Sequence, residues 1–175
     1  MRKLKYFVAC SVDGFIAHKD GSFDGFLTEG EHINDYLTSL KDSFDVALMG
    51  RKTYEVGLKF GVTNPYPTMK QYLFSRTITQ LPNENIQLVS ENVSAVVAAL
   101  KNETGKDIYL CGGAELAATF FNEGLIDEII LKINPFLMGS GIPLFSDNIK
   151  QTDLKLTQSK TYENGVVWLY YEVIK

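Results

Sequence analysis

Apolar and polar positions change their period in residues 107–123, where a buried strand, a glycine turn and an amphipathic helix follow one another. Apolar residues fill 108–111, Gly112 and Gly113 interrupt the run, and apolar side chains recur at helical spacing from Ala114 onward. The turn leaves first-turn N–H groups without partners and without a Cβ in front of them, which suits a phosphate. A tight turn that binds nothing is the alternative, because the full G-x-G-x-x-G pattern is absent.

The same alternation of strand and helix extends over most of the chain. The apolar pattern predicts strands over 4–10, 45–49, 72–77, 86–89 and 126–133, and helices that begin near 31, 51 and 93. Two alternating stretches, 154–162 and 166–173, flank the hairpin signal Asn164-Gly165. We therefore expect a single α/β domain over 1–175, with a mostly parallel central sheet, helices on both faces and an antiparallel C-terminal hairpin.

The stretch 18–30 is long for a loop inside such a domain and is rich in glycine, aspartate and aromatic residues. Long ordered loops are usually lids or binding loops. The aromatic residues Phe15, Phe23, Phe26 and Tyr66 are suited to cover a flat ring, with core packing as the alternative. His18 and His32 are expected to be exposed.

Composition narrows the function classes further. The formal net charge of −4 argues against a nucleic-acid partner, and no apolar stretch reaches the roughly 20 residues of a membrane span. Cys10 and Cys111 lack metal-site spacing and are too few for a disulfide framework. We expect a cytoplasmic enzyme or binding domain with no metal site.

Three strand ends carry residues that suit phosphate groups. These are Gly50-Arg51-Lys52-Thr53, Ser75-Arg76-Thr77 and Gly112-Gly113-Ala114. The carboxyl ends of parallel strands lie along one edge of a sheet, where open α/β sheets bind ligands. Arg51 and Arg76 offer guanidinium groups for a terminal phosphate, with ordinary solvated charges as the alternative. Together the three junctions predict a nucleotide site.

Four motifs then carry a family resemblance over essentially the whole chain. The segment Gly50-Arg51-Lys52-Thr53-Tyr54-Glu55 resembles the Gly-Arg-x-Thr-[Trp/Tyr]-Glu motif of dihydrofolate reductases, and the junctions at 75–76 and 112–113 fall where that family binds its cofactor. The segments 11–17 and 135–145 are more similar to the reductase domain of the riboflavin-biosynthesis protein RibD. The resemblance implies a dihydrofolate reductase-like fold, NADPH binding and hydride transfer to a pteridine- or pyrimidine-like ring.

The resemblance also implies roles for individual residues. It places Arg51, Lys52 and Thr53 on the adenosine phosphates after Gly50, and Ser75 and Arg76 beside the 2′-phosphate. Gly112, Gly113 and Ala114 would take the pyrophosphate, and Ala9, Ile16 and Cys111 would line the nicotinamide. NADPH is expected over NADH because the adenosine-side tripeptides 50–52 and 75–77 carry cations and no carboxylate.

The chain departs from dihydrofolate reductases at the proton donor. Dihydrofolate reductases carry a carboxylate on the helix after the first loop, and here that helix offers only Glu31 and Asp35, neither of which aligns with it. The two isolated cysteines do not form the zinc signature of the RibD deaminase half, which is therefore excluded. Asp13 is the candidate catalytic residue, able to orient substrate or move a proton, with a turn-capping role as the alternative. A nucleotide-binding module of this fold without catalytic activity is the competing function.

Two further expectations concern neighbours in space. The resemblance makes the strands of Cys10 and Cys111 neighbours, so we expect two free thiols close together near the nicotinamide. The segment 126–145 carries more apolar side chains than one sheet edge needs, among them Ile129, Leu137 and Leu144. It is therefore expected to form a two-fold homodimer interface, with burial inside the monomer as the alternative.

Overall fold

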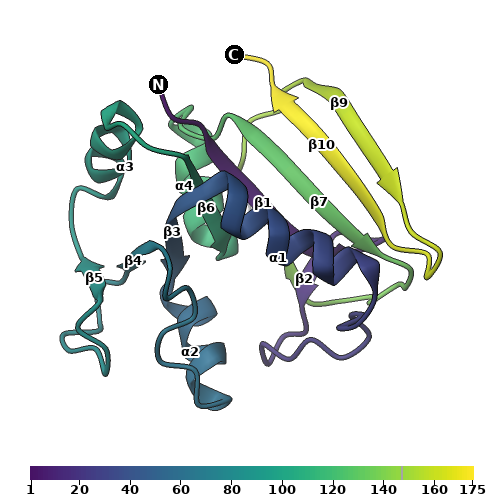
Figure 1. Ribbon diagram of the computed structural model, residues 1–175, viewed down its shortest axis with the longest axis horizontal. Coiled ribbons are helices and arrows are strands. Elements are labelled where there is room, and N and C mark those ends of the chain that lie inside the picture. The colour runs from purple at the N-terminus through teal and green to yellow at the C-terminus, as the bar shows by residue number, and fades with distance from the viewer. Residues whose placement is uncertain (147) are drawn as a thin grey trace.

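The computed structural model describes residues 1–146 and 148–175 and contains one large sheet with helices on both sides (Figure 1). The strands are β1 (Leu4–Ser11), β2 (Phe15–Ala17), β3 (Phe44–Gly50), β4 (Lys70–Phe74), β5 (Ile86–Val89), β6 (Asp107–Gly112), β7 (Glu128–Asn134), β8 (Ile142–Pro143), β9 (Leu154–Thr161) and β10 (Val167–Val173). The helices are α1 (Glu31–Ser43), α2 (Arg51–Lys59), α3 (Val93–Asn102) and α4 (Ala114–Asn122).

The large sheet has the order β5-β4-β3-β6-β1-β7-β10-β9. Pairing is parallel from β5 to β7 and antiparallel for β7–β10 and β10–β9. The predicted parallel sheet with an antiparallel C-terminal hairpin is therefore confirmed. The sequence pattern missed β2 and β8, which pair with each other outside the large sheet. Each has at most three residues, which is too short for a periodic signal.

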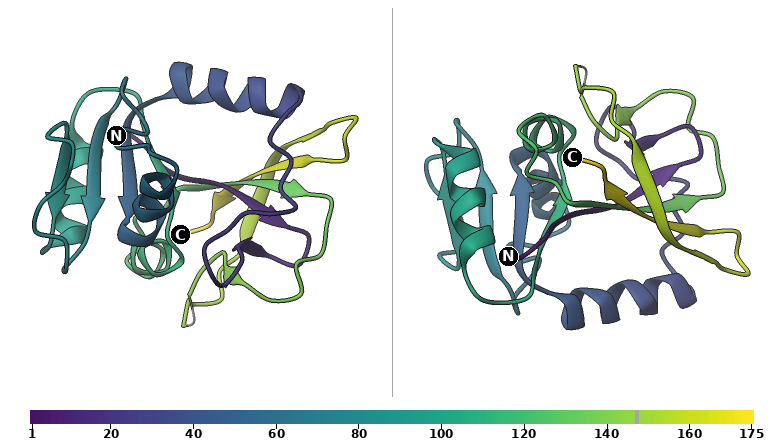
Figure 2. Two further views of the ribbon diagram at one scale, coloured as in Figure 1. Left: turned by 90° about the horizontal axis from the view of Figure 1, so that it is seen from below. Right: turned by 90° about the horizontal axis from the view of Figure 1, so that it is seen from above.

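The predicted placement of helices on both faces is also confirmed. Even-numbered residues of β1, such as Tyr6 and Val8, pack in a cluster with residues of α3 and α4, whereas Phe7 packs with Leu40 of α1. Figure 2 shows α1 and α4 on opposite sides of the sheet. We refer below to the α1 face and the α4 face, and α2 lies on the α1 face through Tyr54, which packs with Met49 and Leu73.

The strand predicted over 72–77 is displaced, because β4 begins at Lys70 and ends at Phe74. The Ser75 hydroxyl accepts hydrogen bonds from the backbone N–H groups of Thr77 and Ile78, at 3.2 and 3.0 Å. A serine that bonds to the backbone two and three residues ahead stabilises a turn in place of a ladder. The Ser75 N–H still donates to the Val89 carbonyl of β5 at 3.0 Å, and the chain turns away from the sheet after Ser75.

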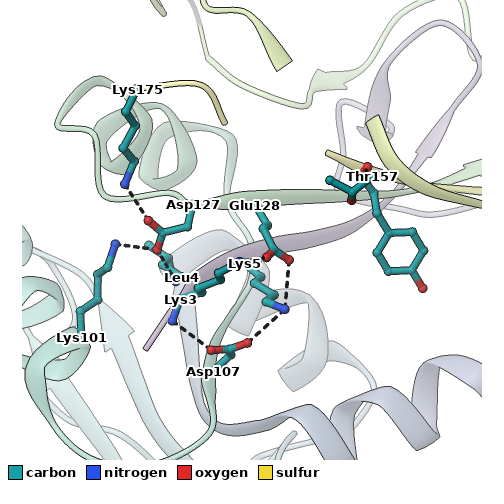
Figure 3. Close-up of polar contacts among 10 residues, drawn as sticks. Lys3, Leu4, Lys5, Lys101, Asp107, Asp127, Glu128, Thr157 and Lys175 are labelled. Carbon is teal, nitrogen blue, oxygen red and sulfur yellow. Dashed lines mark hydrogen bonds and ion pairs between the residues drawn. The ribbon is translucent and has the colours of Figure 1, made fainter. Parts of the chain in front are cut away.

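The amino edge of the sheet is held by ion pairs between neighbouring strands (Figure 3). Lys5 of β1 lies 3.0 Å from both Asp107 of β6 and Glu128 of β7. Asp127 accepts from the Lys101 and Lys175 ammonium groups at 2.6 Å and from the Leu4 N–H at 2.8 Å. Burial alone would raise the pKa of Asp127, but the hydrogen bonds from Lys101 and Lys175 lower it below its ordinary value.

Replacing Asp127 with asparagine is expected to lower the free energy of unfolding by about 2–3 kcal/mol. The nearly buried Lys101 ammonium would lose its carboxylate counter-ion and keep only neutral acceptors, among them the Leu125 carbonyl 2.8 Å away. Because the folded pKa of Asp127 is depressed, its contribution is present above pH about 4 and is lost as pH falls through that folded pKa. Urea titration at pH 7 and in acid measures the difference, with the exposed Asp153→Asn as the matched control. Equal midpoints for both variants would contradict the assigned role.

Candidate functional site

Two strand–helix junctions lie against each other at the carboxyl edge of the sheet. Gly50 precedes α2 and Gly113 precedes α4, and neither helix has a side-chain cap at its N-terminus. A Cβ built on Gly113 would lie 3.5 Å from the Cα of Gly50, and one on Gly112 would lie 3.3 Å from the Thr53 hydroxyl. Two helix N-termini without side-chain caps therefore approach each other through glycine backbone, with the Leu116 Cβ as the side-chain atom nearest to both glycines. This cradle fits the pyrophosphate of a dinucleotide.

The cations beside the cradle already have partners on the protein. A guanidinium nitrogen of Arg51 lies 3.0 Å from both carboxylate oxygens of Glu55, one helical turn further along α2. The Lys52 ammonium lies 3.4 Å from Glu115 at the start of α4, and both side chains are mostly exposed. Exposed pairs of this kind contribute little stability. The Glu55 and Glu115 carboxylates nevertheless offset part of the positive charge of Arg51 and Lys52 beside the cradle.

Arg76 lies apart from Arg51, in a groove lined by Arg76, Ser90, Glu91, Asn92 and Val93. The exposed Arg76 side chain follows β4, and the other lining residues form the uncapped N-terminus of α3. Guanidinium and helix N-terminus together suit a phosphate, and the Glu91 carboxylate opposes it. Ser75 is buried beneath, with its hydroxyl engaged in the turn.

The expected nicotinamide contacts divide between the two faces of the sheet. Ala9 is half-buried on the α1 face near the end of β1, and Cys111 packs partly against the clusters of that face. Ile16 packs against the α4-face cluster. Ala9 and Cys111 therefore lie on adjacent strands, β1 and β6, while Ile16 belongs to the other side.

The cysteine prediction is confirmed for the free thiols and the neighbouring strands, but the expected close approach of the two thiols is wrong because they lie on opposite faces of the sheet. Both thiols are free, and their strands are neighbours in the sheet. Alternation along β1 places Cys10 with Tyr6 and Val8 on the α4 face, opposite to the face that Cys111 contacts. Burial raises the pKa of Cys10 to about 11 and that of Cys111 to about 12, so both remain protonated thiols near neutral pH.

Tyrosine hydroxyls gather next to Cys111 on the α1 face. The hydroxyls of Tyr36 and Tyr109 are 2.8 Å apart, and the Tyr66 ring lies edge-on to Tyr109 with centroids 5.4 Å apart. Burial raises the pKa of all three above the ordinary value. Tyr66 thus joins an aromatic cluster, whereas Phe23 packs on Phe60 just after α2, with ring centroids 5.6 Å apart.

Asp13 ties two loops together. Its carboxylate accepts from the Ser11 hydroxyl at 2.6 Å and from the backbone N–H groups of Met138 and Gly139 at 3.0 and 2.7 Å. These hydrogen bonds, that from Ser11 first, lower the pKa of Asp13 to about 2. The carboxylate is therefore ionised at neutral pH and joins the β1–β2 turn to the β7–β8 loop. Its part in catalysis stays a prediction.

Glu31 and Asp35, the candidates for the carboxylate that dihydrofolate reductases carry on this helix, both form ion pairs with Lys160. Asp35 lies 2.5 Å from the Lys160 ammonium and 2.7 Å from the Tyr162 hydroxyl, and Glu31 lies 3.0 Å from the same ammonium. His32, expected to be exposed, is buried, with ring nitrogens 3.1 Å from the Leu27 carbonyl oxygen and 3.0 Å from the Asn164 amide nitrogen. That prediction was wrong because tertiary contacts, not the polar helix start, decide the burial of this ring.

Sequence reasoning missed Lys132. This residue stands in the otherwise apolar run Ile129–Ile133 of β7, and its side chain is 9% exposed. A charged residue inside an apolar strand was the available signal, since lysine is almost never fully buried without a partner. Lys132 faces Ala9 across the β1–β7 pair.

Two classes of site have no support in the part of the chain that the structure describes. Within residues 1–146 and 148–175, no group of three or more His, Cys, Asp or Glu side chains could hold a metal ion. None of the described helices combines the length and the apolar character needed to cross a membrane.

The sheet order and the glycine cradle are those of a dihydrofolate reductase-like α/β domain. Comparison with known proteins gives the family, since the family model "RibD C-terminal domain" matches residues 2–168. The chain belongs to the RibD C-terminal domain family.

Individual relatives agree with this assignment. The chain is 36% identical to the uncharacterized protein YwjB of Bacillus subtilis over 166 residues, which cover 94% of this chain and 95% of YwjB. The crystal structure of a "Putative riboflavin biosynthesis protein" from Shewanella sp. PV-4 matches with a TM-score of 0.83 and 26% identity, over 100% of both chains. A pyrimidine reductase-like protein from Corynebacterium diphtheriae matches with a TM-score of 0.71 over 99% of this chain and 92% of that one. At 18% identity, this last likeness shows the fold alone.

Proposed function

We propose that this protein is an NADPH-dependent reductase that transfers a hydride to a pteridine- or pyrimidine-like heterocycle. The observation that carries the proposal is the close approach of Gly50 and Gly113, which brings the free N-termini of α2 and α4 to one point. Membership of the RibD C-terminal domain family supports the same class.

In this proposal the junction residues bind the cofactor. Gly112, Gly113 and Ala114 hold the pyrophosphate, Thr53 supports it from α2, and Arg76 with the N-terminus of α3 receives the 2′-phosphate. Ala9 of β1 and Cys111 of β6, near the carboxyl ends of their strands, would line the nicotinamide. The cofactor supplies the hydride, and the protein aligns the two rings and shields them from water.

Thermal melting with and without NADPH tests the proposal first. A ligand at about 100 times its Kd stabilises the native state by about 2.7 kcal/mol, which for this chain length raises the melting temperature by roughly 5–10 °C. Steady NADPH oxidation with a panel of heterocycles then tests turnover. An unchanged melting temperature at millimolar NADPH would contradict the proposal.

A nucleotide-binding module without catalysis is the second candidate function. The observation in its favour is that Asp35, the carboxylate on the helix covering the site, is bound to Lys160 and Tyr162. Such a module would show the NADPH-dependent rise in melting temperature and no oxidation with any heterocycle. The two outcomes separate the hypotheses without knowledge of the natural substrate.

We also propose that the chain forms a two-fold homodimer through the exposed part of 126–145. Ile129 is buried within the monomer and Leu144 packs against its core, which leaves Leu137, 73% exposed, as the main apolar side chain available. Light scattering at micromolar concentration is expected to give twice the monomer mass, and Leu137→Asp is expected to reduce it. A monomeric mass for the unmodified protein would contradict this assembly.

A further inference from the structure

Lys132 ends among aromatic rings on the α1 face. The register places it beside Ala9 of β1 and Trp168 of β10. Its ammonium nitrogen lies 3.3 Å from the centroid of the Tyr36 ring and 4.8 Å from that of Phe7. The charged group therefore lies between α1 and the sheet, on the strand next to Ala9, which the proposed reductase would use to line the nicotinamide.

This ammonium has no counter-ion among residues 1–146 and 148–175. No described carboxylate forms an ion pair with Lys132, and no described acceptor receives a hydrogen bond from its Nζ. The covering helix does carry Asp35 one position before Tyr36, but Asp35 is bound to Lys160. Burying a lone ammonium is unfavourable, and contact with an aromatic face offsets only part of the cost. The charge therefore lacks an oxygen partner within the described chain.

A second donor beside Lys132 also lacks an acceptor. Across the described residues, the indole Nε1 of Trp168 is the only fully buried side-chain polar atom without a hydrogen-bond partner. No described acceptor receives a hydrogen bond from the Lys132 Nζ either, and the residue as a whole is 9% exposed. Lys132 and Trp168 face each other across the β7–β10 pair. Neighbouring donors without acceptors indicate that an outside acceptor belongs here.

The electrostatics agree with this geometry. Burial lowers the pKa of Lys132 to about 7, and the nearby Cys111 opposes that shift. The other titratable groups of this aromatic cluster, Tyr36 from α1, Tyr109 from β6 and Tyr66, have raised pKa values and stay neutral. A negatively polarised oxygen would therefore be the group that keeps the ammonium charged.

We propose that Lys132 binds a ring oxygen of the substrate, so that the site selects heterocycles with an oxo or deprotonated oxo group over those with amino groups only. This inference rests on the proposed function, because it places the reducible ring on the α1 face beside Ala9. Lys132 is then the residue that determines specificity. An amino group at the same position of the ring would present N–H donors to the N–H donors of the ammonium. The two groups could not form a hydrogen bond, so binding would be weaker.

A matched pair of ligands tests the inference. Pteridine-2,4-dione and 2,4-diaminopteridine have the same ring system and differ in oxo against amino groups. Calorimetry with and without NADPH is expected to show that the wild-type protein binds the dione about 10–100-fold more tightly than the diamine. Lys132→Met, which fills the aromatic pocket without a charge, is expected to bring this ratio close to one.

The control variant is Lys5→Met, from the same face of the sheet. Lys5 has its partners Asp107 and Glu128 at the amino edge, so this change is expected to reduce stability and to leave the ligand ratio unchanged. A wild-type ratio retained by Lys132→Met, or a wild-type protein that binds neither pteridine or does not discriminate between them, would overturn the inference. The NADPH-dependent melting shift is read separately in every variant, so that loss of the proposed cofactor function is recognised on its own.

Melting without any ligand gives an independent readout. Because the folded pKa of Lys132 lies below that of an unfolded lysine, the wild-type protein gains stability as pH rises from about 7 toward 10. Lys132→Met is therefore expected to melt at a higher temperature than wild type at pH 7, and this excess is expected to shrink by pH 9. An excess that stays constant with pH, or a loss of stability at pH 7, would contradict the unpaired ammonium on which the inference depends.

Discussion

Replacing Arg76 with alanine is expected to weaken NADPH binding by about 10–100-fold and to leave NADH binding nearly unchanged. Charge-assisted hydrogen bonds contribute roughly 1.5–3 kcal/mol each, and 1.4 kcal/mol corresponds to a tenfold change in affinity. Arg76 is exposed in the groove at the N-terminus of α3, where it is available to a 2′-phosphate. Calorimetry with both cofactors measures the ratio of their affinities.

The structure ranks the other charged positions around this site. Arg51→Ala is expected to have a smaller effect, because the Arg51 guanidinium already pairs with Glu55. Glu91→Gln is expected to raise the preference for NADPH, since it removes a negative charge from the Arg76 groove. The exposed Lys59, at the far end of α2, provides the control Lys59→Ala. Equal affinity of the wild-type protein for the two cofactors would show that the 2′-phosphate is not recognised here.

Replacing Gly113 with alanine is expected to abolish the NADPH-dependent rise in melting temperature. Gly113 has a φ of +109°, which L-residues rarely adopt, and its added Cβ would lie 3.5 Å from the Cα of Gly50. The substitution would both strain the junction, at a cost of about 1–3 kcal/mol, and place a methyl group between the two helix N-termini. Differential scanning fluorimetry over an NADPH titration measures both effects.

Gly124, at the other end of α4, is the matched control. It also has a positive φ, of +67°, but nothing lies within 4 Å of an added Cβ, so Gly124→Ala introduces strain alone. Gly124→Ala is expected to keep the NADPH shift on a less stable protein. If Gly113→Ala does not fold, Gly50→Ala tests the close approach, because its φ of −81° is open to any residue. If Gly113→Ala bound NADPH with wild-type affinity, the glycine cradle would not be part of the cofactor site.

The fold was predictable from the sequence because local signals agreed with each other. The glycine junctions after β3 and β6, the periodicity of α3 and the hairpin signal at Asn164-Gly165 all identified their elements correctly. Prediction failed where distant contacts decide the structure: β2 and β8 exist only through each other, and Ser75 ends β4 with its own side chain. The helix and strand propensities of individual residues do not report contacts between distant parts of the chain.

The glycine junctions proposed to bind the cofactor could be identified from the sequence, whereas the residues proposed to contact the substrate could not. Phosphate contacts depend on backbone N–H groups, and glycines at strand ends mark them directly in a sequence. The substrate side depends on which side chains three elements bring together. Tyr36, Tyr109 and Lys132 come from α1, β6 and β7 and share no motif, so their association follows only from the register of β1 with β6 and β7.

The ion pairs at the amino edge have a consequence for how this scaffold can diversify. They fasten β1, β6 and β7 to one another at the end of the strands that lies farthest from the glycine cradle. The interactions that hold these strands together and the proposed ligand site therefore lie at opposite ends of the same strands. Side-chain substitutions at the carboxyl edge, outside the glycine junctions, are expected to change the proposed ligand site while the ion pairs at the amino edge continue to hold the strands in register.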